Sequence, residues 1–203
     1  RFRVALFTNL GHDHLDLHET QERYFAAKAR LFEPDLTDLG VVNVDDVHGR
    51  LLADAAAVDI VPYSLADVSD LSVSAAGHAY RWRGVEVRVP LGGRFNVSNS
   101  LGVATVLGAL GHEPAAIAAA LATVSQVPGR FERVDAGQPF AVIVDFAHTP
   151  DALQLVLDVA RDLAGQARLI VVFGCGGDRD HDKRPVMGRV AADVADVIIV
   201  TSD

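Results

Sequence analysis

The chain has 203 residues, of which 50% are apolar, and its 27 acidic and 18 basic residues give a formal net charge of −9. This length and composition suffice for one large or two small domains with a sizeable core. An acidic chain without a basic stripe is a poor partner for nucleic acid, and no apolar stretch reaches the length of a membrane span. We therefore expect neither a nucleic-acid nor a membrane partner.

The single cysteine, Cys175, cannot form an internal disulfide. Together with the lack of a signal peptide, this predicts a cytoplasmic protein, which we also expect to be a monomer. Cys175 has no histidine and acid arranged beside it, and we interpret it as a buried loop cysteine. The chain starts at Arg1 without a methionine and stops just after an apolar run, so we expect a fragment of a longer polypeptide.

Residues 4–7 predict a strand that ends in a loop rich in possible metal ligands. These ligands are three histidines and four acids, His12, His14, His18, Asp13, Asp16, Glu19 and Glu22. The carboxyl ends of strands are where open α/β sheets bind ligands. A helix follows, with Thr20 as its N-cap and Lys28 two turns in. We interpret residues 8–32 as the core of an active site.

Lys28 stands among mainly apolar and aromatic neighbours in this predicted helix. Two interpretations are open at this point. Burial against an apolar surface would favour the neutral amine, which is a nucleophile. Alternatively, the stem of the side chain lies on the core while its ammonium group stays in water.

The next segments alternate between strand and helix patterns, which is typical of a parallel sheet covered by helices. They are a strand at 40–44, a helix at 47–57 and a strand at 60–63. Alternating segments between 71 and 89, separated by glycines, then predict an antiparallel meander. Two helices follow at 98–110 and 114–123, and residues 125–129 break the helical pattern. We place a domain boundary there, between domains 1–127 and 128–203.

The second half begins with a predicted hairpin and continues as a βαβ unit. The hairpin comprises strands at 131–134 and 140–144. A helix at 150–163 follows, with Thr149 as its cap. The later segments are a strand at 169–173, a glycine-rich loop at 174–182, a helix at 185–194 and a strand at 197–200. The loop lacks the Gly-x-Gly-x-x-Gly spacing and carries three acids, which argues against a dinucleotide site. The whole chain is predicted to be α/β.

Two pairs of polar residues stand at predicted element ends. Asn96 and Asn99 are three residues apart, so their amides can face one side and match an adenine edge, or they can simply cap the helix. Asp145 ends a strand and His148 precedes a helix, an arrangement suited to ribose hydroxyls and phosphate oxygens, although Asp145 can instead cap the following loop. Arg130, near the boundary, is either a cation for polyphosphate or a surface arginine.

The motif Asp13-His14-Leu15-Asp16, followed by the run from Tyr24 to Phe32 around Lys28, closely resembles the Mur ligases, the ATP-dependent amide-forming enzymes of peptidoglycan synthesis. The resemblance covers essentially the whole chain. It implies that residues 1–127 form part of a P-loop-type, mostly parallel central domain with an antiparallel meander. Residues 128–203 would then form part of a Rossmann-like domain.

The resemblance also implies roles for individual residues. Lys28 would be carbamylated and would hold Mg²⁺ together with His14. Gly11-His12 departs from the family's usual Ser-Arg or Gly-Arg, which leaves the roles of His12 and His18 open. The remaining expected ligands of ATP are Asn96 and Asn99 at the adenine, Arg130, Asp145 near the ribose, and His148.

Within the family, the loop at 174–184 is most similar to that of the members that add the third peptide residue. There the arginine at the Arg179 position binds the incoming amino acid, and Asp203 stands where the Asp-Asn-Pro-Arg recognition motif begins. A guanidinium can clamp the second carboxylate of meso-diaminopimelate, which lysine lacks. Because the sequence stops at Asp203, the choice between meso-diaminopimelate and lysine stays open.

The implied reaction joins a diamino acid to a UDP-N-acetylmuramoyl dipeptide through an acyl phosphate, with ATP and Mg²⁺. No Gly-Lys pair occurs in the chain, so the phosphate loop of a P-loop enzyme is absent. The family carries that loop upstream, and we expect the chain alone to be inactive. Two alternatives remain: a folylpolyglutamate-type ligase and a non-catalytic nucleotide-binding module.

Overall fold

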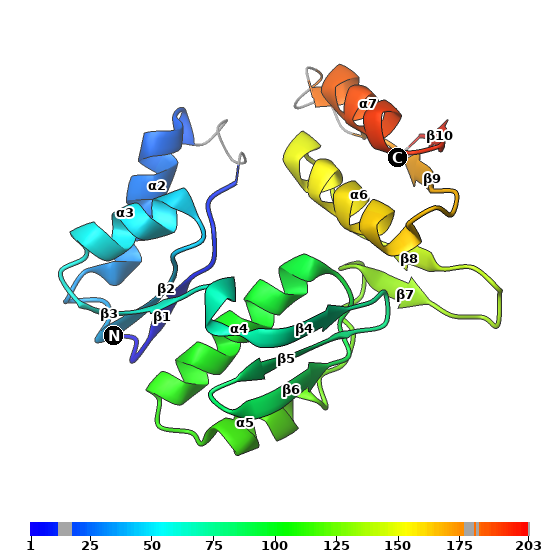
Figure 1. The fold of residues 1–203 in the computed structure, drawn as a ribbon. Coiled ribbons are helices and arrows are strands. Elements are labelled where there is room, and N and C mark those ends of the chain that lie inside the picture. Colours follow the sequence, from blue (N-terminus) through cyan, green and yellow to red (C-terminus); the bar gives the residue numbers. More distant parts are fainter. Residues whose placement is uncertain (12–17, 177–180, 182, 203) are drawn as a thin grey trace. The chain divides into compact units, whose positions relative to one another are not determined.

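The computed structural model describes residues 1–11, 18–176, 181 and 183–202. The chain forms two compact units, Arg1–Ser125 and Gln126–Asp203. The boundary predicted from the sequence lies two residues further along, between 127 and 128. Each unit is mixed α/β (Figure 1).

A parallel sheet of three strands forms the first part of unit 1. The strands are β1 (Ala5–Phe7), β2 (Leu39–Asn43) and β3 (Asp59–Tyr63), paired in that order. Helix α2 (Gln21–Ala29), with the short 3₁₀ helix η1 (Arg30–Phe32), connects β1 to β2, and α3 (Val47–Ala55) connects β2 to β3. The predicted β-helix-β alternation is therefore confirmed.

Neighbouring residues of β2 pack into two different cores, because successive side chains of a strand point to opposite faces of a sheet. Val41 belongs to the core shared with α4, whereas Val42 belongs to the core shared with Phe7 and Leu52. Tyr24 and Phe25 of α2 pack against this second core. Helices thus cover both faces of the sheet.

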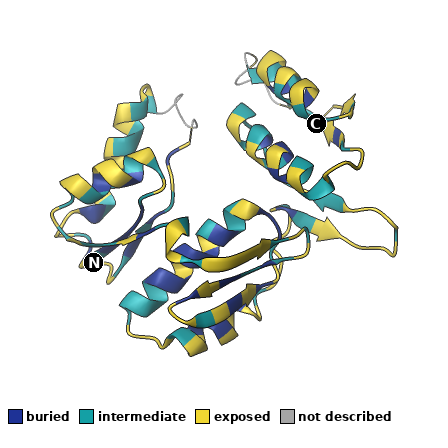
Figure 2. Ribbon diagram, in the orientation of Figure 1, coloured by how far each residue is buried: buried dark blue, intermediate teal, exposed yellow. Residues whose placement is uncertain are grey.

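The antiparallel meander comprises β4 (Ser69–Val73), β5 (His78–Trp82) and β6 (Val85–Val89) and follows the 3₁₀ helix η2 (Leu65–Asp67). Helices α4 (Arg94–Ala109) and α5 (Pro114–Leu121) pack on it. The inner positions of β5 and α4 form the largest buried patch of this unit (Figure 2). Because α4 also contacts Val41 and Tyr63, it joins the meander to the parallel sheet.

Helix α4 begins four residues earlier than the predicted start at residue 98. Its N-cap is Gly93, whose φ of 89° lies in the left-handed region that favours glycine. The main-chain N–H of Asn96 donates to the Gly93 carbonyl at 3.1 Å, which places Asn96 inside the first turn. The alternative that Asn96 and Asn99 cap the helix is therefore wrong.

Unit 2 begins with the antiparallel hairpin β7 (Glu132–Val134) and β8 (Val142–Val144). Helix α6 (Pro150–Ala164), strand β9 (Ile170–Phe173), helix α7 (Lys183–Val194) and strand β10 (Val197–Val200) follow, with β9 and β10 paired in parallel. The predicted hairpin and βαβ unit are confirmed. The core of this unit consists of Leu153, Leu157, Val171, Met187 and Ala191.

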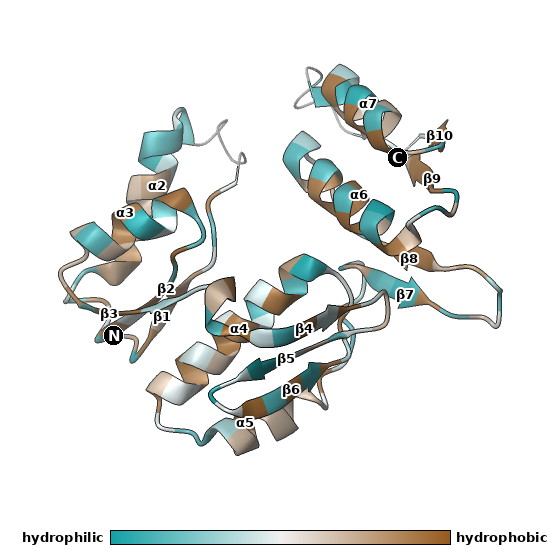
Figure 3. Ribbon diagram, viewed as in Figure 1, coloured by the Kyte–Doolittle hydropathy of each residue, from teal (hydrophilic) through white to brown (hydrophobic). Residues whose placement is uncertain are grey.

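Local signals account for the starts of helices α2 and α6. Thr20 Oγ1 accepts the Arg23 N–H at 3.3 Å, and Thr149 Oγ1 accepts the Ala152 N–H at 3.3 Å, so both predicted N-caps are confirmed. Helix α6 carries both apolar and polar positions (Figure 3), and it contributes Leu153 and Leu157 to the core of unit 2. Among the described residues, no helix is both long and apolar enough to cross a membrane.

Candidate active site

A pocket lies at the carboxyl end of β1, where the sequence analysis placed the active site. It has a volume of about 280 Å³ and is lined by the strand end, by the last turn of α2 and by Leu31 and Phe32 of η1. Its polar lining residues are Thr8, Asn9 and Lys28. Strand β1 delivers Thr8 and Asn9 directly, because they are the residues that follow Phe7. The structure therefore brings Lys28 to the loop that starts the metal-ligand motif.

Lys28 reaches this pocket from a half-exposed helix. Its Nζ lies 5.0 Å from the ring centroid of Tyr24, a cation–π contact. The ring of His18 stacks on Tyr24 with centroids 5.0 Å apart. None of the residues of α2 is fully buried. Lys28 is thus less enclosed than an apolar helix face suggested, because α2 packs only through half-buried side chains.

The expected metal partner of Lys28, His14, lies outside the described residues, as does His12. In the described part of the chain, no group of three or more His, Cys, Asp or Glu side chains is placed to hold a metal ion. The pocket does offer oxygen atoms from Thr8 and Asn9. Oxygen donors are the ligands that Mg²⁺ prefers, so the described lining fits that ion in kind.

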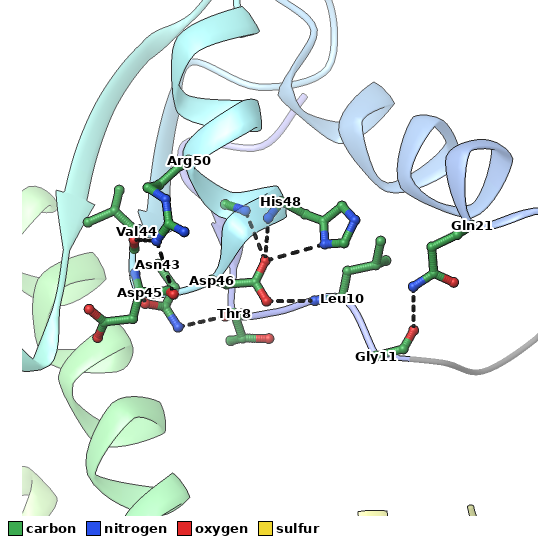
Figure 4. Close-up of polar contacts among 11 residues, drawn as sticks. Thr8, Leu10, Gly11, Gln21, Asn43, Val44, Asp45, Asp46, His48 and Arg50 are labelled. Atoms are coloured by element: carbon green, nitrogen blue, oxygen red, sulfur yellow. Dashed lines mark hydrogen bonds and ion pairs between the residues drawn. The ribbon is translucent and has the colours of Figure 1, made fainter. Parts of the chain in front are cut away.

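Sequence reasoning missed a polar network at the end of β2. Asn43, Asp45 and Asp46 follow one another there and contact the neighbouring strand ends and α3 (Figure 4). Beside them, burial raises the pKa of Tyr63 to about 12; the nearby carboxylates of Asp45 and Asp46 add to the shift, and the Ser98 hydroxyl opposes it. The sequence Asn-x-Asp-Asp directly after a buried strand was an available signal for this edge.

Asn96 and Asn99 do lie side by side on α4, as predicted from their spacing. Asn99 Nδ2 donates to Asn96 Oδ1 at 3.2 Å, and Asn96 Nδ2 donates to the Gly92 carbonyl at 2.7 Å. Asn96 is half-buried and Asn99 is exposed. Asn96 therefore holds the Asn99 amide in place, and Asn99 is the more accessible of the two.

A buried polar cluster fixes this turn of α4 on the meander. His78 Nε2 lies 2.8 Å from Ser100 Oγ, and Tyr80 Oη lies 3.2 Å from the same oxygen. His78 Nδ1 lies 2.7 Å from the Leu91 carbonyl, which can only accept a hydrogen bond. Nδ1 therefore carries the proton of the neutral ring, and Nε2 accepts. Burial lowers the pKa of His78, and this hydrogen bond to Leu91 opposes the shift.

Two of the predicted ATP contacts, Arg130 and His148, lie against the ring of Phe146, which was not predicted from the sequence. The Arg130 guanidinium lies 4.8 Å from the Phe146 ring centroid, and the His148 ring lies 5.1 Å from it. Phe146 itself is 59% exposed. Arg130 and His148 are also exposed, so the structure places them together around one aromatic ring.

The carboxylate of Asp145 is bonded to the main chain on both sides. Its Oδ2 accepts the Phe131 N–H at 2.7 Å and its Oδ1 accepts the Ala147 N–H at 2.9 Å. Phe131 has a φ of 49°, an unusual backbone angle for a residue other than glycine. Asp145 therefore caps the loop that follows its strand through Ala147, as the alternative expected, and it also holds the main chain of Phe131 in the turn at residues 129–131. Lone pairs on both carboxylate oxygens remain for a ligand.

The predicted amino-acid contacts, Arg179 and Asp203, lie outside the described residues. Cys175 is half-buried, and its Sγ lies 3.5 Å from the Sδ of the buried Met187. Cys175 therefore packs against the core from its loop, but it is only half-buried, whereas a buried cysteine was expected.

The fold and these sites define an α/β protein with polar groups at the carboxyl edge of a parallel sheet. Residues 1–107 match the family model described as "Mur ligase middle domain". Residues 129–203 match the one described as "Mur ligase, glutamate ligase domain". The chain therefore belongs to the Mur ligase family.

The chain is similar to UDP-N-acetylmuramoyl-L-alanyl-D-glutamate–2,6-diaminopimelate ligases from several bacteria. The enzyme from Gloeobacter violaceus is 45% identical over 100% of this chain and 43% of its own length. The one from Syntrophomonas wolfei is 42% identical over 100% of this chain and 44% of its own length. The chain thus spans less than half the length of these curated relatives.

Solved structures agree with this likeness. A structure of a ligase with the same name aligns with a TM-score of 0.68 and 36% identity, covering 99% of this chain and 44% of that chain. MurF from Acinetobacter baumannii aligns with a TM-score of 0.80 at 20% identity, covering 97% of this chain and 46% of its own. A structure described as an FPGS–AMPPCP–folate complex has a TM-score of 0.75 at 17% identity, covering 98% of this chain and 50% of its own. At these lower identities the likeness shows the fold alone.

Proposed function

We propose that this chain is part of an ATP-dependent ligase that adds meso-diaminopimelate to UDP-N-acetylmuramoyl-L-alanyl-D-glutamate. The observation that carries the proposal is the Lys28 pocket at the end of β1, in a chain whose relatives are named for this reaction. The expectations of a cytoplasmic location and a monomeric state stay predictions.

The proposed reaction has two steps. An oxygen of the dipeptide carboxylate attacks the γ-phosphorus of ATP, and ADP leaves. The amine nitrogen of the incoming amino acid then attacks the acyl carbon of the acyl phosphate, and inorganic phosphate leaves. Mg²⁺, when bound, would neutralise the negative charge that gathers among the phosphates.

The described residues contribute positioning and charge to this proposal. Asn99, held by Asn96, offers an amide edge to adenine. Arg130 supplies a cation, and His148 lies beside the same Phe146 ring. Lys28, once carbamylated, would turn from a cation into an oxygen ligand, and together with His14 it would hold Mg²⁺ at the pocket. Asp145 near the ribose, and Arg179 and Asp203 at the amino acid, stay predictions.

The proposal is tested in the intact ligase by measuring phosphate release and product with three acceptor pairs. These pairs are the muramoyl dipeptide with meso-diaminopimelate, the same dipeptide with lysine, and folate with glutamate. We expect turnover with diaminopimelate. A preference for lysine would reject the proposed amino acid, and turnover with folate would favour the folylpolyglutamate alternative.

The role of Lys28 is tested in the same assay. Lys28→Ala should lower kcat on the order of 100-fold, as removal of a group that stabilises transition-state charge does. A small added carboxylate should restore part of the rate. The control is Arg30→Ala, which removes an exposed cation two positions further along the chain. Undiminished turnover of Lys28→Ala would remove Lys28 from the mechanism.

A further inference from the structure

The end of β2 carries three polar side chains that reach three different neighbours. Asp45 accepts hydrogen bonds from Ser64 Oγ at 2.7 Å and from the Leu65 N–H at 2.8 Å, both beyond the end of β3. Asp46 accepts the N–H groups of His48 and Gly49, each at 2.9 Å, at the start of α3. Because β2 is the middle strand, its end is flanked by the ends of both β1 and β3.

Asn43 is the member of this group that faces β1. Its Nδ2 donates to the Thr8 carbonyl at 2.8 Å, and Figure 4 shows the amide pointing at that residue. The same nitrogen lies 3.5 Å from Ser98 Oγ on α4, and Oδ1 accepts the Asp45 N–H at 3.0 Å. With 8% of its surface exposed, Asn43 is buried. One side chain therefore touches β1, its own strand end and α4.

The two outer partners of Asn43 belong to the two halves of the proposed site in unit 1. Thr8 lines the pocket together with Lys28. Ser98 lies on α4 between Asn96 and Asn99. The Asn43 amide is thus hydrogen-bonded to a residue that lines the Lys28 pocket. It also contacts the turn of α4 that carries Asn96 and Asn99.

The chemistry of this position requires an amide. The Thr8 carbonyl can only accept, so the side chain opposite it must donate, while the Asp45 N–H needs an acceptor from the same side chain. An aspartate has the same shape, but it places an acceptor oxygen against the Thr8 carbonyl where Asn43 Nδ2 donates. An alanine leaves both main-chain groups without this partner, and loss of a buried hydrogen bond destabilises its surroundings.

We propose that Asn43 is a positioning residue of the ligase, which holds the Thr8 side of the Lys28 pocket and the Asn96–Asn99 turn of α4 in register. The assignment of ligand roles to Lys28, Asn96 and Asn99 rests on the proposed function. The hydrogen bonds of Asn43 do not.

The first test is hydrogen exchange on the full chain without ligand. Asn43→Asp and Asn43→Ala should each speed exchange about 5-fold in peptides covering residues 5–11 and 94–102, the change expected from losing a bond worth ~1 kcal/mol. The matched control is Asp45→Ala, which removes a hydrogen-bonded side chain from the same edge but on the β3 side. It should speed exchange only around residues 64–68. If the Asn43 variants exchange at the wild-type rate in both peptides, 5–11 and 94–102, the inference is wrong.

The second test separates positioning from general stability and uses the intact ligase. Asn43→Asp should lower kcat and raise the KM for ATP, together costing on the order of 10-fold to 100-fold in kcat/KM, because small displacements of aligned groups are costly. Asp45→Ala should lower the Tm without changing either constant. If both variants lower the Tm but leave kcat and the KM for ATP unchanged, Asn43 is only structural and the inference is wrong. A wild-type ligase inactive on every acceptor pair would reject the proposed function, whereas the exchange result would stand.

Discussion

At the scale of single residues, the structure shows which of the predicted ligands are held in place by other groups of the protein. Asn96 is bonded on both sides of its amide, and Asp145 is bonded through both carboxylate oxygens. These residues therefore have a structural role before any ligand binds. The exposed Asn99, Arg130 and His148 are the accessible members of the predicted set.

His78 provides a prediction at this scale. Its pKa is lowered in the folded state, so the unfolded state binds the proton more tightly. Stability should therefore be unaffected by His78 above a pH of about 6.5, the ordinary pKa of histidine, and should fall as the pH drops below that value toward the folded-state pKa. The slope contributed by His78 is at most about 1.4 kcal/mol per pH unit.

Urea unfolding of the chain between pH 7.5 and pH 5 would measure this slope. His78→Asn should be less stable at every pH, because the Ser100 contact is lost, but its stability should depend less steeply on pH. Equal slopes for wild type and His78→Asn would show that His78 does not titrate in this range.

At the scale of elements, helix α3 packs unusually close to the end of β2. A Cβ atom on Gly49 would lie 1.8 Å from the Asn43 carbonyl oxygen and 3.0 Å from its carbon, both of them backbone atoms. Asp46 caps the same helix and also lies 3.5 Å from the Leu10 N–H. The first turn of α3 is therefore part of the support for Asn43 and for the loop that follows β1.

Two glycine-to-alanine substitutions test this packing. In an open helix, Gly→Ala stabilises by roughly 0.5–1 kcal/mol because glycine loses more backbone entropy on folding. Gly188 of α7 has no atom within 4 Å of such a Cβ, so Gly188→Ala should stabilise unit 2. Gly49→Ala should instead destabilise unit 1 by about 1–3 kcal/mol, the usual effect of overpacking. Denaturant unfolding measures both, and a stable Gly49→Ala would contradict the close approach.

At the scale of the whole molecule, the described cores respect the division into two units. Two clusters lie in unit 1, and the third, around Leu157 and Met187, lies in unit 2. Each unit therefore has apolar surface buried within itself, which is the condition for folding alone. The Mur ligase matches fall on either side of the same division.

We expect the chain to unfold in two steps. Trp82 is the one tryptophan of the sequence, lies in unit 1 and is 4% exposed, so its fluorescence reports unit 1 alone. Far-ultraviolet circular dichroism reports both units, and the two urea curves should not coincide. A fragment of residues 1–125 should reproduce the fluorescence curve of the whole chain. Coincident curves and an unfolded fragment would show a single cooperative unit.

Much of this protein was readable from the sequence, because helix caps, strand periodicity and turn residues depend on neighbours a few positions apart. Thr20 and Thr149 cap their helices as predicted, and the predicted parallel and antiparallel strands are present. The motif around Lys28 and the segment with Asn96 and Asn99 also resemble those of the Mur ligases, and this resemblance indicated the family. The start of α4 was missed, because the helix-starting role of Gly93 depends on a backbone angle that composition does not reveal.

Only the tertiary structure decided how the site is supported. The Asn43 contacts join residues 35 and 55 positions apart in the chain, and Asp145 holds a main-chain group 14 positions away. Arg130 and Phe146, 16 positions apart, likewise meet only once the chain has folded. A short motif specifies which side chains can do the chemistry, whereas a hydrogen bond across such separations exists only when packing brings its two ends together.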